Sequence, residues 1–90
     1  MLIKKSTRKG KRFMVTFQNG KTVHFGLDGG KTYIDEGDKI KRAAYLARHQ
    51  KRENWNDPYS AGALSKFITW GESTDINKNI EAFVKRFGNL

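Results

Sequence analysis

The segment HFGLDGGKTYID, residues 24–35, has residue types that could hold a nucleotide phosphate, because glycines, Lys and Thr follow an expected strand. A phosphate-binding loop needs four residues between its first Gly and the Gly-Lys-Thr that closes it. Only three residues separate Gly26 from the Gly-Lys-Thr at 30–32, and Asp28 within the loop would repel a phosphate. No helix is expected directly after Thr32, so no helix N-terminus would face the anion. We therefore interpret this segment as a glycine-rich turn.

A second group of chemically competent side chains lies on the helix that we expect to begin after Asp38. Helical spacing from Ile40 onward gathers small apolar residues on one side, and we expect these to pack against the protein: Ala43, Ala44, Leu46 and Ala47. The opposite, basic side holds Lys41, Arg42, Tyr45, Arg48, His49 and Arg52. Such a face can lie along a nucleic-acid backbone, with cations and the Tyr45 hydroxyl at phosphates. The alternative for Tyr45 is packing against the sheet edge or Trp55.

The N-terminal segment adds a second set of cations. Residues 1–12 carry six basic and no acidic side chains, and residues 38–53 carry six basic against two acidic ones. The six basic residues of the arm are Lys4, Lys5, Arg8, Lys9, Lys11 and Arg12. The net charge of +9 predicts a polyanionic partner, because each phosphate contact releases counterions. No side chain can be assigned to base edges, so we expect binding without strong sequence specificity.

Metal binding and catalysis have little support in the sequence. There is no Cys, and the two His, His24 and His49, fall on different expected elements. The acids between Asp28 and Asp38 do not have the spacing of a calcium loop. We expect no metal, no cofactor and no enzymatic activity. A nuclease-like or regulatory role for His49 is the weaker alternative, since its spatial neighbours are invisible in a sequence.

Two expected strands follow the basic N-terminal arm and form a hairpin. Apolar residues alternate along 13–17 and 22–25, and Asn19-Gly20 between them suits a hairpin turn with two positive φ angles. We expect Phe13, Phe17 and Phe25 to face the core and not to form a base-stacking surface. Residues 2–6 either add a strand or belong to a disordered arm, and residues 31–35 could form a third short strand.

Two further helices are expected after the basic one. Ser60 is suited to cap a helix over 61–70, which Gly71 ends. The last helix is expected to begin at Ser73 or Thr74 and to stop at Gly88. Its core-facing residues are Ile76, Ile80, Phe83, Val84 and Phe87. Trp55, Tyr59 and Trp70 are expected to be core and loop anchors.

These elements predict an α+β fold, in which a small β-hairpin or three-stranded antiparallel sheet is packed by three helices. The 90 residues favour a single domain over 1–90, with 1–11 a basic arm that could be flexible. A core this small favours help from a partner or from homo-oligomerisation. No apolar run reaches the roughly 18 residues of a membrane span, and no secretory signal follows the first residues. We expect a soluble protein that is not secreted.

Four stretches resemble a family of short basic proteins encoded by large double-stranded DNA viruses and some phages. They are KTVHFG (21–26), DKIKRAAYLARH (38–49), SAGALSKFITWG (60–71) and NIEAFVKRFG (79–88). The resemblance implies no catalytic activity. It implies a location in the virion or in the host-cell interior, whether nucleus or cytoplasmic viral factory, with DNA or other virion proteins as partners.

The sequence and the resemblance therefore favour two functions. The first is a basic virus- or phage-encoded protein that binds nucleic acid, preferably double-stranded DNA, through phosphate contacts in the virion or nucleoid. The second is a minor capsid or internal virion protein that acts through protein–protein contacts.

Overall fold

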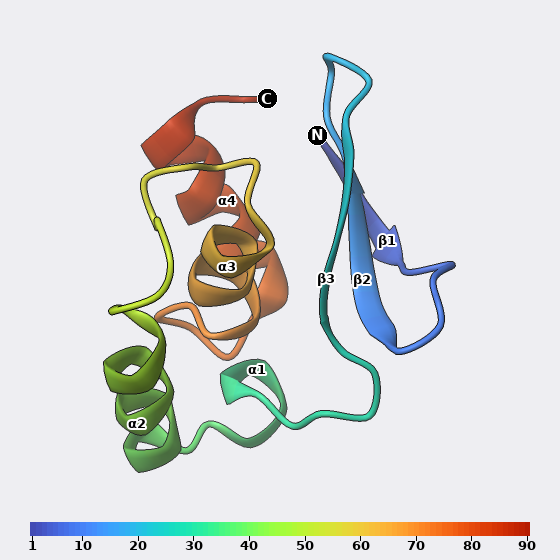
Figure 1. Ribbon diagram of the computed structural model, residues 1–90. Helices are drawn as coiled ribbons and strands as arrows, with labels where there is room; N and C mark the ends of the chain where they lie inside the picture. Colours follow the sequence, from blue (N-terminus) through green and yellow to red (C-terminus); the bar gives the residue numbers. More distant parts are fainter.

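The computed structural model describes residues 1–90 and has two layers, with every helix on the same face of one sheet (Figure 1). The sheet is antiparallel with the order β1-β2-β3, formed by Leu2–Lys5, Lys11–Thr16 and Thr22–Leu27. The α+β prediction is confirmed. Of the two alternatives for residues 2–6, the structure has a strand, which pairs with β2 from Leu2↔Thr16 to Lys5↔Phe13.

The turn between β2 and β3 differs from the two-residue turn that Asn19-Gly20 predicts. Only Gly20 has a positive φ, 86°. The N–H of Phe17 bonds to Lys21 O, and the N–H of Gly20 bonds back to Phe17 O. Three residues, 18–20, therefore lie inside the closing pair Phe17–Lys21, with a tight turn followed by a glycine in the left-handed region, a common hairpin solution.

A short helix, α1 (Tyr33–Glu36), lies where the sequence suggested a third strand. The carboxylate of Asp35 accepts hydrogen bonds from the backbone N–H and the hydroxyl of Thr32, both at 2.9 Å. Gly37 then ends the helix at φ 63°, and its N–H bonds to Tyr33 O. These local caps stabilise one helical turn. The strand prediction for 31–35 is wrong, and so is the expectation that no helix begins directly after Thr32. The spacing from Gly26 and the acid at Asp28 still argue against a phosphate-binding loop.

Helix α2 (Lys39–His49) begins where expected, because Asp38 accepts from the N–H groups of Ile40 and Lys41. The second expected helix is capped by Ser60, as predicted, but has two parts. Its first turn is α3 (Ala61–Leu64), and η1 (Ser65–Thr69) continues it as a π-helix with Trp70 N–H bonded to Ser65 O. A π-helical turn holds one more residue than an α-turn.

The last helix, α4, spans Ile76–Phe87 and ends at Gly88, as predicted. Its start is later than expected: Asp75 is not inside the first turn but caps it, accepting from the N–H of Asn77 at 2.9 Å. None of these helices is long and apolar enough to cross a membrane.

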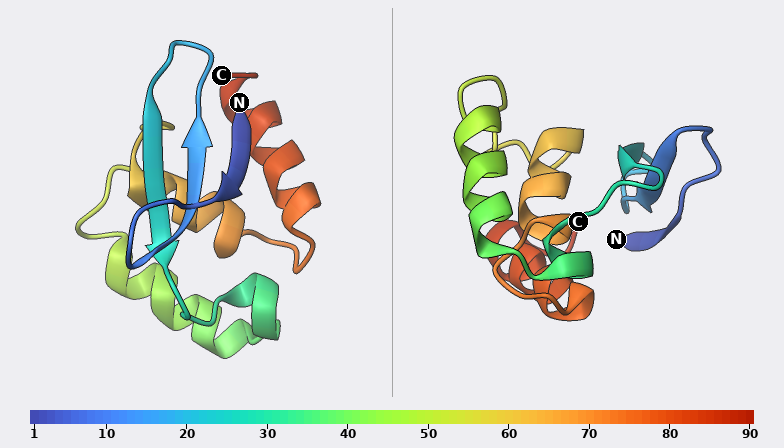
Figure 2. Two further views of the ribbon diagram at one scale, coloured as in Figure 1. Left: turned by 90° about the vertical axis from the view of Figure 1, so that its right-hand side faces the viewer. Right: turned by 90° about the horizontal axis from the view of Figure 1, so that it is seen from below.

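The main core lies between the sheet and the pair α3–η1 and α4. It consists of side chains at most 2% exposed, contributed by both layers: Val15, Phe17, Phe25, Leu64, Ile68 and Phe83. The expectation that the hairpin aromatics face the core is confirmed for Phe17 and Phe25, and Phe13 packs at the edge of the cluster. The opposite face of the sheet carries no helix (Figure 2, left).

Asn79 joins η1, the following loop and α4 at a single buried point. The side chain is 3% exposed. Its Nδ2 donates to Ile68 O at 2.8 Å and Ser73 O at 2.7 Å, and its Oδ1 accepts from Ser73 N–H at 3.0 Å. The loop passes so close that a Cβ on Gly71 would lie 2.4 Å from Phe67 O, which explains the glycine.

Replacing Asn79 with Ala should lower the free energy of unfolding by about 2 kcal/mol, because three hydrogen bonds to the backbone, one buried and two partly buried, would be lost. Urea unfolding followed by circular dichroism measures this loss. Asn77→Ala is the matched control, since Asn77 is exposed on the same helix and its side chain forms no hydrogen bond; its change should stay within about 0.5 kcal/mol. Equal losses for the two variants would contradict the role of Asn79.

Candidate nucleic-acid interface

Helix α2 is rotated relative to the expected orientation. Its only buried residue is Tyr45, whose ring is stacked on that of Trp70, with centroids 4.2 Å apart and planes 7° from parallel. Ile40, expected on the packed side, is 84% exposed, and Ala43, Ala44 and Ala47 are exposed as well. Leu46 alone of the predicted face is partly buried, packed against the cluster that contains Tyr45 and Trp70. The predicted packing of the alanines is wrong, because an aromatic ring removes far more apolar area from water than alanine methyl groups do.

The rotation turns Arg42 inward. Its Nε donates to the carbonyl oxygens of Trp70 at 2.9 Å and of Gly71 at 3.2 Å. Lys41, its neighbour, forms an ion pair with Glu36 at 2.7 Å. Two of the basic residues assigned to the phosphate-contacting face of this helix therefore have partners within the protein.

His49 and Tyr45 form a connected group with Glu53. The imidazole is stacked on the Tyr45 ring with centroids 4.1 Å apart, and His49 Nδ1 lies 3.4 Å from Glu53 Oε1. The same oxygen accepts a hydrogen bond from Trp55 Nε1 at 3.1 Å. Burial, with the nearby Glu53 charge, raises the pKa of Tyr45 to about 12. Its phenol is thus neutral at ordinary pH and cannot act as a base.

Arg12 of the predicted arm is also engaged. Its two terminal nitrogens donate to the two oxygens of Asp35, each at 2.7 Å, which is the bidentate geometry of a strong charge-assisted pair. The bond to Arg12 holds the pKa of the Asp35 carboxyl well below its usual range. Arg12 therefore fixes α1 against the start of β2.

The remaining predicted contacts are exposed and form no ion pair. They are Lys4, Lys5, Arg8, Lys9, Lys11, Arg48 and Arg52. The connection from β1 to β2 crosses the open face of the sheet (Figure 2, left). Ser6 Oγ lies 2.7 Å from His24 Nδ1, and the Thr7 hydroxyl donates to the Met14 sulfur at 3.8 Å. The N–H of Lys11 bonds to Arg8 O and the N–H of Asp28 bonds to Gly10 O, which places residues 8–10 beside the start of β2 and the end of β3.

Two pockets, each of about 410 Å³, bring cations from separate elements together. Lys11, Lys31 and His49 line the first, and Arg48, His49, Lys51 and Arg52 line the second. His49 lines both pockets, so the two groups of basic residues adjoin one another and border one region of the surface. We call it the basic strip, defined by Lys11, Lys31, Arg48, His49, Lys51 and Arg52.

The sequence missed two members of the basic strip. Lys31 lies in the segment that we interpret as a glycine-rich turn, and Lys51 falls outside the predicted basic face of the helix. A charge count over residues 38–53 includes Lys51, but no signal in the sequence places Lys31 near His49. That proximity arises only when β3 and α2 meet at the first pocket.

The strip has the chemistry of anion binding. Its basic residues come from β2, the β3–α1 connection, α2 and the turn after α2. Glu53 is the one carboxylate in the two pockets, held by Trp55 and His49. Hydroxyl groups of Thr32, Ser65 and Thr69 line the same space as Lys11. No group of three or more His, Asp or Glu side chains in the protein is arranged to hold a metal ion.

Fold and surface together define a small α+β domain with a positively charged strip beside its sheet. The chain belongs to a family of unknown function, DUF5754, whose model matches residues 1–49. That match includes the sheet, α1 and α2 and ends at His49, whereas the two C-terminal stretches of the resemblance noted above lie beyond it. No curated protein and no solved structure matches the chain.

The Arg12–Asp35 pair should make the free energy of unfolding depend on pH. Because folding lowers the Asp35 pKa, its contribution is fully present above the unfolded value near 3.8 and is lost as pH falls toward the folded value. Asp35→Asn should lower the free energy of unfolding by about 1 kcal/mol at pH 7, and the difference from wild type should shrink below about pH 4. Denaturant titrations at pH 7, 4 and 2.5 measure it.

Glu81→Gln removes a negative charge from an exposed side chain that forms no hydrogen bond and no ion pair, and it serves as the control. Its difference from wild type should be small at each of the three pH values. A wild-type advantage over Asp35→Asn that persists unchanged at pH 2.5 would contradict the assignment.

Proposed function

We propose that this protein binds nucleic acid, preferably double-stranded DNA, through phosphate contacts and without strong base specificity. The observation that carries the proposal is the basic strip: cations from β2, the β3–α1 connection and the end of α2 adjoin one another, and its lysines and arginines have no carboxylate partner. Each phosphate that such a surface neutralises releases counterions, which favours binding to any sequence.

The contact residues differ in part from those expected from the sequence alone. Lys4, Lys5, Arg8 and Lys9 extend the strip along the edge strand and the loop beside it. Tyr45, Arg42 and Arg12 act indirectly, because their side chains hold α2, the loop after η1 and α1 in place. Lys41 is paired with Glu36 on the exposed surface and can exchange this partner for a phosphate at little cost.

We also propose a viral or phage origin, with the protein in the virion or in the infected cell as a genome-associated component. Support comes from the stretches that resemble short basic proteins of large double-stranded DNA viruses and from the net charge of +9. Binding alone accounts for the strip, so the proposal includes no catalytic step and no cofactor.

One observation favours the second function, a minor capsid or internal virion protein. The outward side of α2 presents Ile40, 84% exposed, together with Ala43, Ala44 and Ala47. A protein partner could cover this side while the basic strip faces the genome. Copy number in purified virions separates the two roles, because a capsid component follows capsid symmetry and a genome-binding component follows genome length.

The double variant Arg48→Gln/Arg52→Gln should bind duplex DNA at least about tenfold more weakly than wild type at low salt. The slope of log affinity against log salt should fall by about 0.9 for each lost phosphate contact. Mobility-shift titrations on two unrelated duplexes over a range of NaCl concentrations measure affinity, slope and sequence preference together.

Lys21→Gln/Lys85→Gln is the control, because it removes two charges at exposed positions outside the strip. Its affinity should stay close to that of wild type. The proposal is overturned if wild type does not bind DNA or RNA at low salt, or if the control double variant loses as much affinity as Arg48→Gln/Arg52→Gln.

A further inference from the structure

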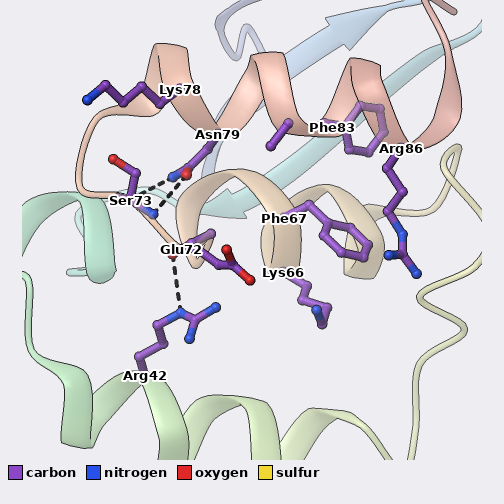
Figure 3. A pocket seen from close by; sticks show the side chains of 11 residues that line it. Arg42, Lys66, Phe67, Glu72, Ser73, Lys78, Asn79, Phe83 and Arg86 are labelled. Carbon is purple, nitrogen blue, oxygen red and sulfur yellow. Dashed lines mark hydrogen bonds between the residues drawn. The ribbon is translucent and has the colours of Figure 1, made fainter.

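A second positively charged pocket lies away from the basic strip, where α2, η1 and α4 meet (Figure 3). It has a volume of about 370 Å³, and three cations reach it from three different elements: Arg42, Lys66 and Arg86. Lys78, on the first turn of α4, lines its far end. Glu72 is the only acidic residue in the lining.

None of these cations is neutralised within the protein. The three ion pairs of the structure lie elsewhere, and Glu72 belongs to none of them. Burial and the charges of Arg42 and Arg86 lower the pKa of Lys66, whereas Glu72 acts in the opposite sense. Like charges thus gather in a partly buried space, an arrangement that an anion would relieve.

Aromatic rings hold the cations in place without cancelling their charge. Lys66 Nζ lies 4.1 Å from the centre of the Phe67 ring and 4.9 Å from that of Trp55. Arg86 Cζ lies 4.9 Å from the Phe67 ring and 5.5 Å from the Phe87 ring. Cation–π contacts of this kind fix position without an oxygen acceptor for the N–H groups, so the donors stay available to a ligand.

Arg42 is pre-organised in the same way. Its Nε is bound to two carbonyl oxygens of the loop after η1, and its terminal nitrogens make no hydrogen bond within the protein (Figure 3). Gly71 permits that loop to pass close to Phe67 and Asn79, which sets the position of the carbonyls. A guanidinium anchored through Nε presents its fork of N–H groups to an anion.

We propose that this pocket binds one phosphate group, that of a phosphomonoester or of inorganic phosphate. With Arg42, Lys66, Lys78 and Arg86 against Glu72, the lining has an excess of three positive charges. A phosphomonoester carries about −1.5 to −2 at pH 7 and three acceptor oxygens, which matches three donor side chains better than a carboxylate does. The volume is in the lower part of the range of small-molecule sites.

The site is separate from the basic strip. Arg42 lines this pocket, whereas His49 lines a pocket of the basic strip. Both residues lie on α2, but the stacked rings of Tyr45 and Trp70 stand between the two pockets. The proposal therefore does not rest on DNA binding by the strip. The phosphate could be free in solution or could be the 5′-terminal phosphate of a nucleic-acid strand, and two probes distinguish these sources.

The first probe is inorganic phosphate, titrated into the full chain at constant ionic strength and followed by calorimetry. Lys66→Met and Arg86→Gln should each weaken phosphate binding at least about tenfold, because each removes a charged donor. Glu72→Gln should tighten it, since the only opposing carboxylate is removed. Lys85→Met, one residue from Arg86 and exposed, should leave it unchanged.

The second probe is a short single-stranded oligonucleotide with either a 5′-phosphate or a 5′-hydroxyl group. A preference for the phosphorylated strand that disappears in Lys66→Met assigns the pocket to strand ends. Phosphate binding without that preference assigns it to a free phosphate compound. The proposal fails if wild type binds no phosphate, if Lys85→Met loses as much as Arg86→Gln, or if Glu72→Gln weakens binding.

Closed circular duplex DNA, which has no terminal phosphate, separates this proposal from DNA binding by the strip. The pocket variants should bind it like wild type, and Arg48→Gln/Arg52→Gln should bind it weakly while retaining affinity for inorganic phosphate. Because Lys66 contacts two rings, unfolding curves for Lys66→Met accompany the titrations. The exposed Glu72→Gln variant tests the site with minimal risk to the fold.

Discussion

The stacking of Tyr45 on Trp70 is the contact on which the arrangement of charge in this protein depends. Tyr45 is the only buried residue of α2, so the ring pair is the main attachment of that helix to the body of the domain. Full burial of such a side chain contributes about 1.5–3 kcal/mol, and an aromatic pair adds about 0.5–1.5 kcal/mol. These energies exceed what the alanine side of the helix could gain, and they fix its rotation.

The rotation then determines where each cation of α2 lies. Residues three before and four after Tyr45 share its side of a helix, so Arg42 and His49 must flank the ring pair. Arg42 turns toward the loop after η1 and His49 toward Glu53, while Arg48 and Arg52 stay on the surface. One aromatic contact thus divides a run of cations that appears continuous in the sequence into a pocket and a strip.

Apart from α1 and the form of the turn at Gly20, features governed by neighbouring residues could be predicted from the sequence, and features governed by distant ones could not. The hairpin, the caps at Asp38 and Ser60 and the stop at Gly88 depend on local spacing, and they are confirmed. The orientation of α2 depends on Trp70, a residue 25 positions beyond Tyr45, and periodicity alone gave the wrong side. No pattern in the sequence predicts that one pocket is lined by Arg42, Lys66 and Arg86, because three separate elements contribute them.

The roles of the acidic residues explain why most lysines and arginines have no carboxylate partner. Of the nine acids, Asp35 and Glu36 form ion pairs with Arg12 and Lys41, and Glu53 lies beside the His49 imidazole. Asp38 and Asp75 instead cap helices, and Asp57 accepts from the N–H of Tyr59 in a turn. Carboxylates that accept from backbone N–H groups stabilise local structure without pairing the lysines and arginines. The folded state therefore brings cations together, and their repulsion lowers its stability. A domain with so small a core is only marginally stable. An anion that binds this state and not the unfolded chain removes the repulsion and stabilises the fold, so binding and stability are thermodynamically linked.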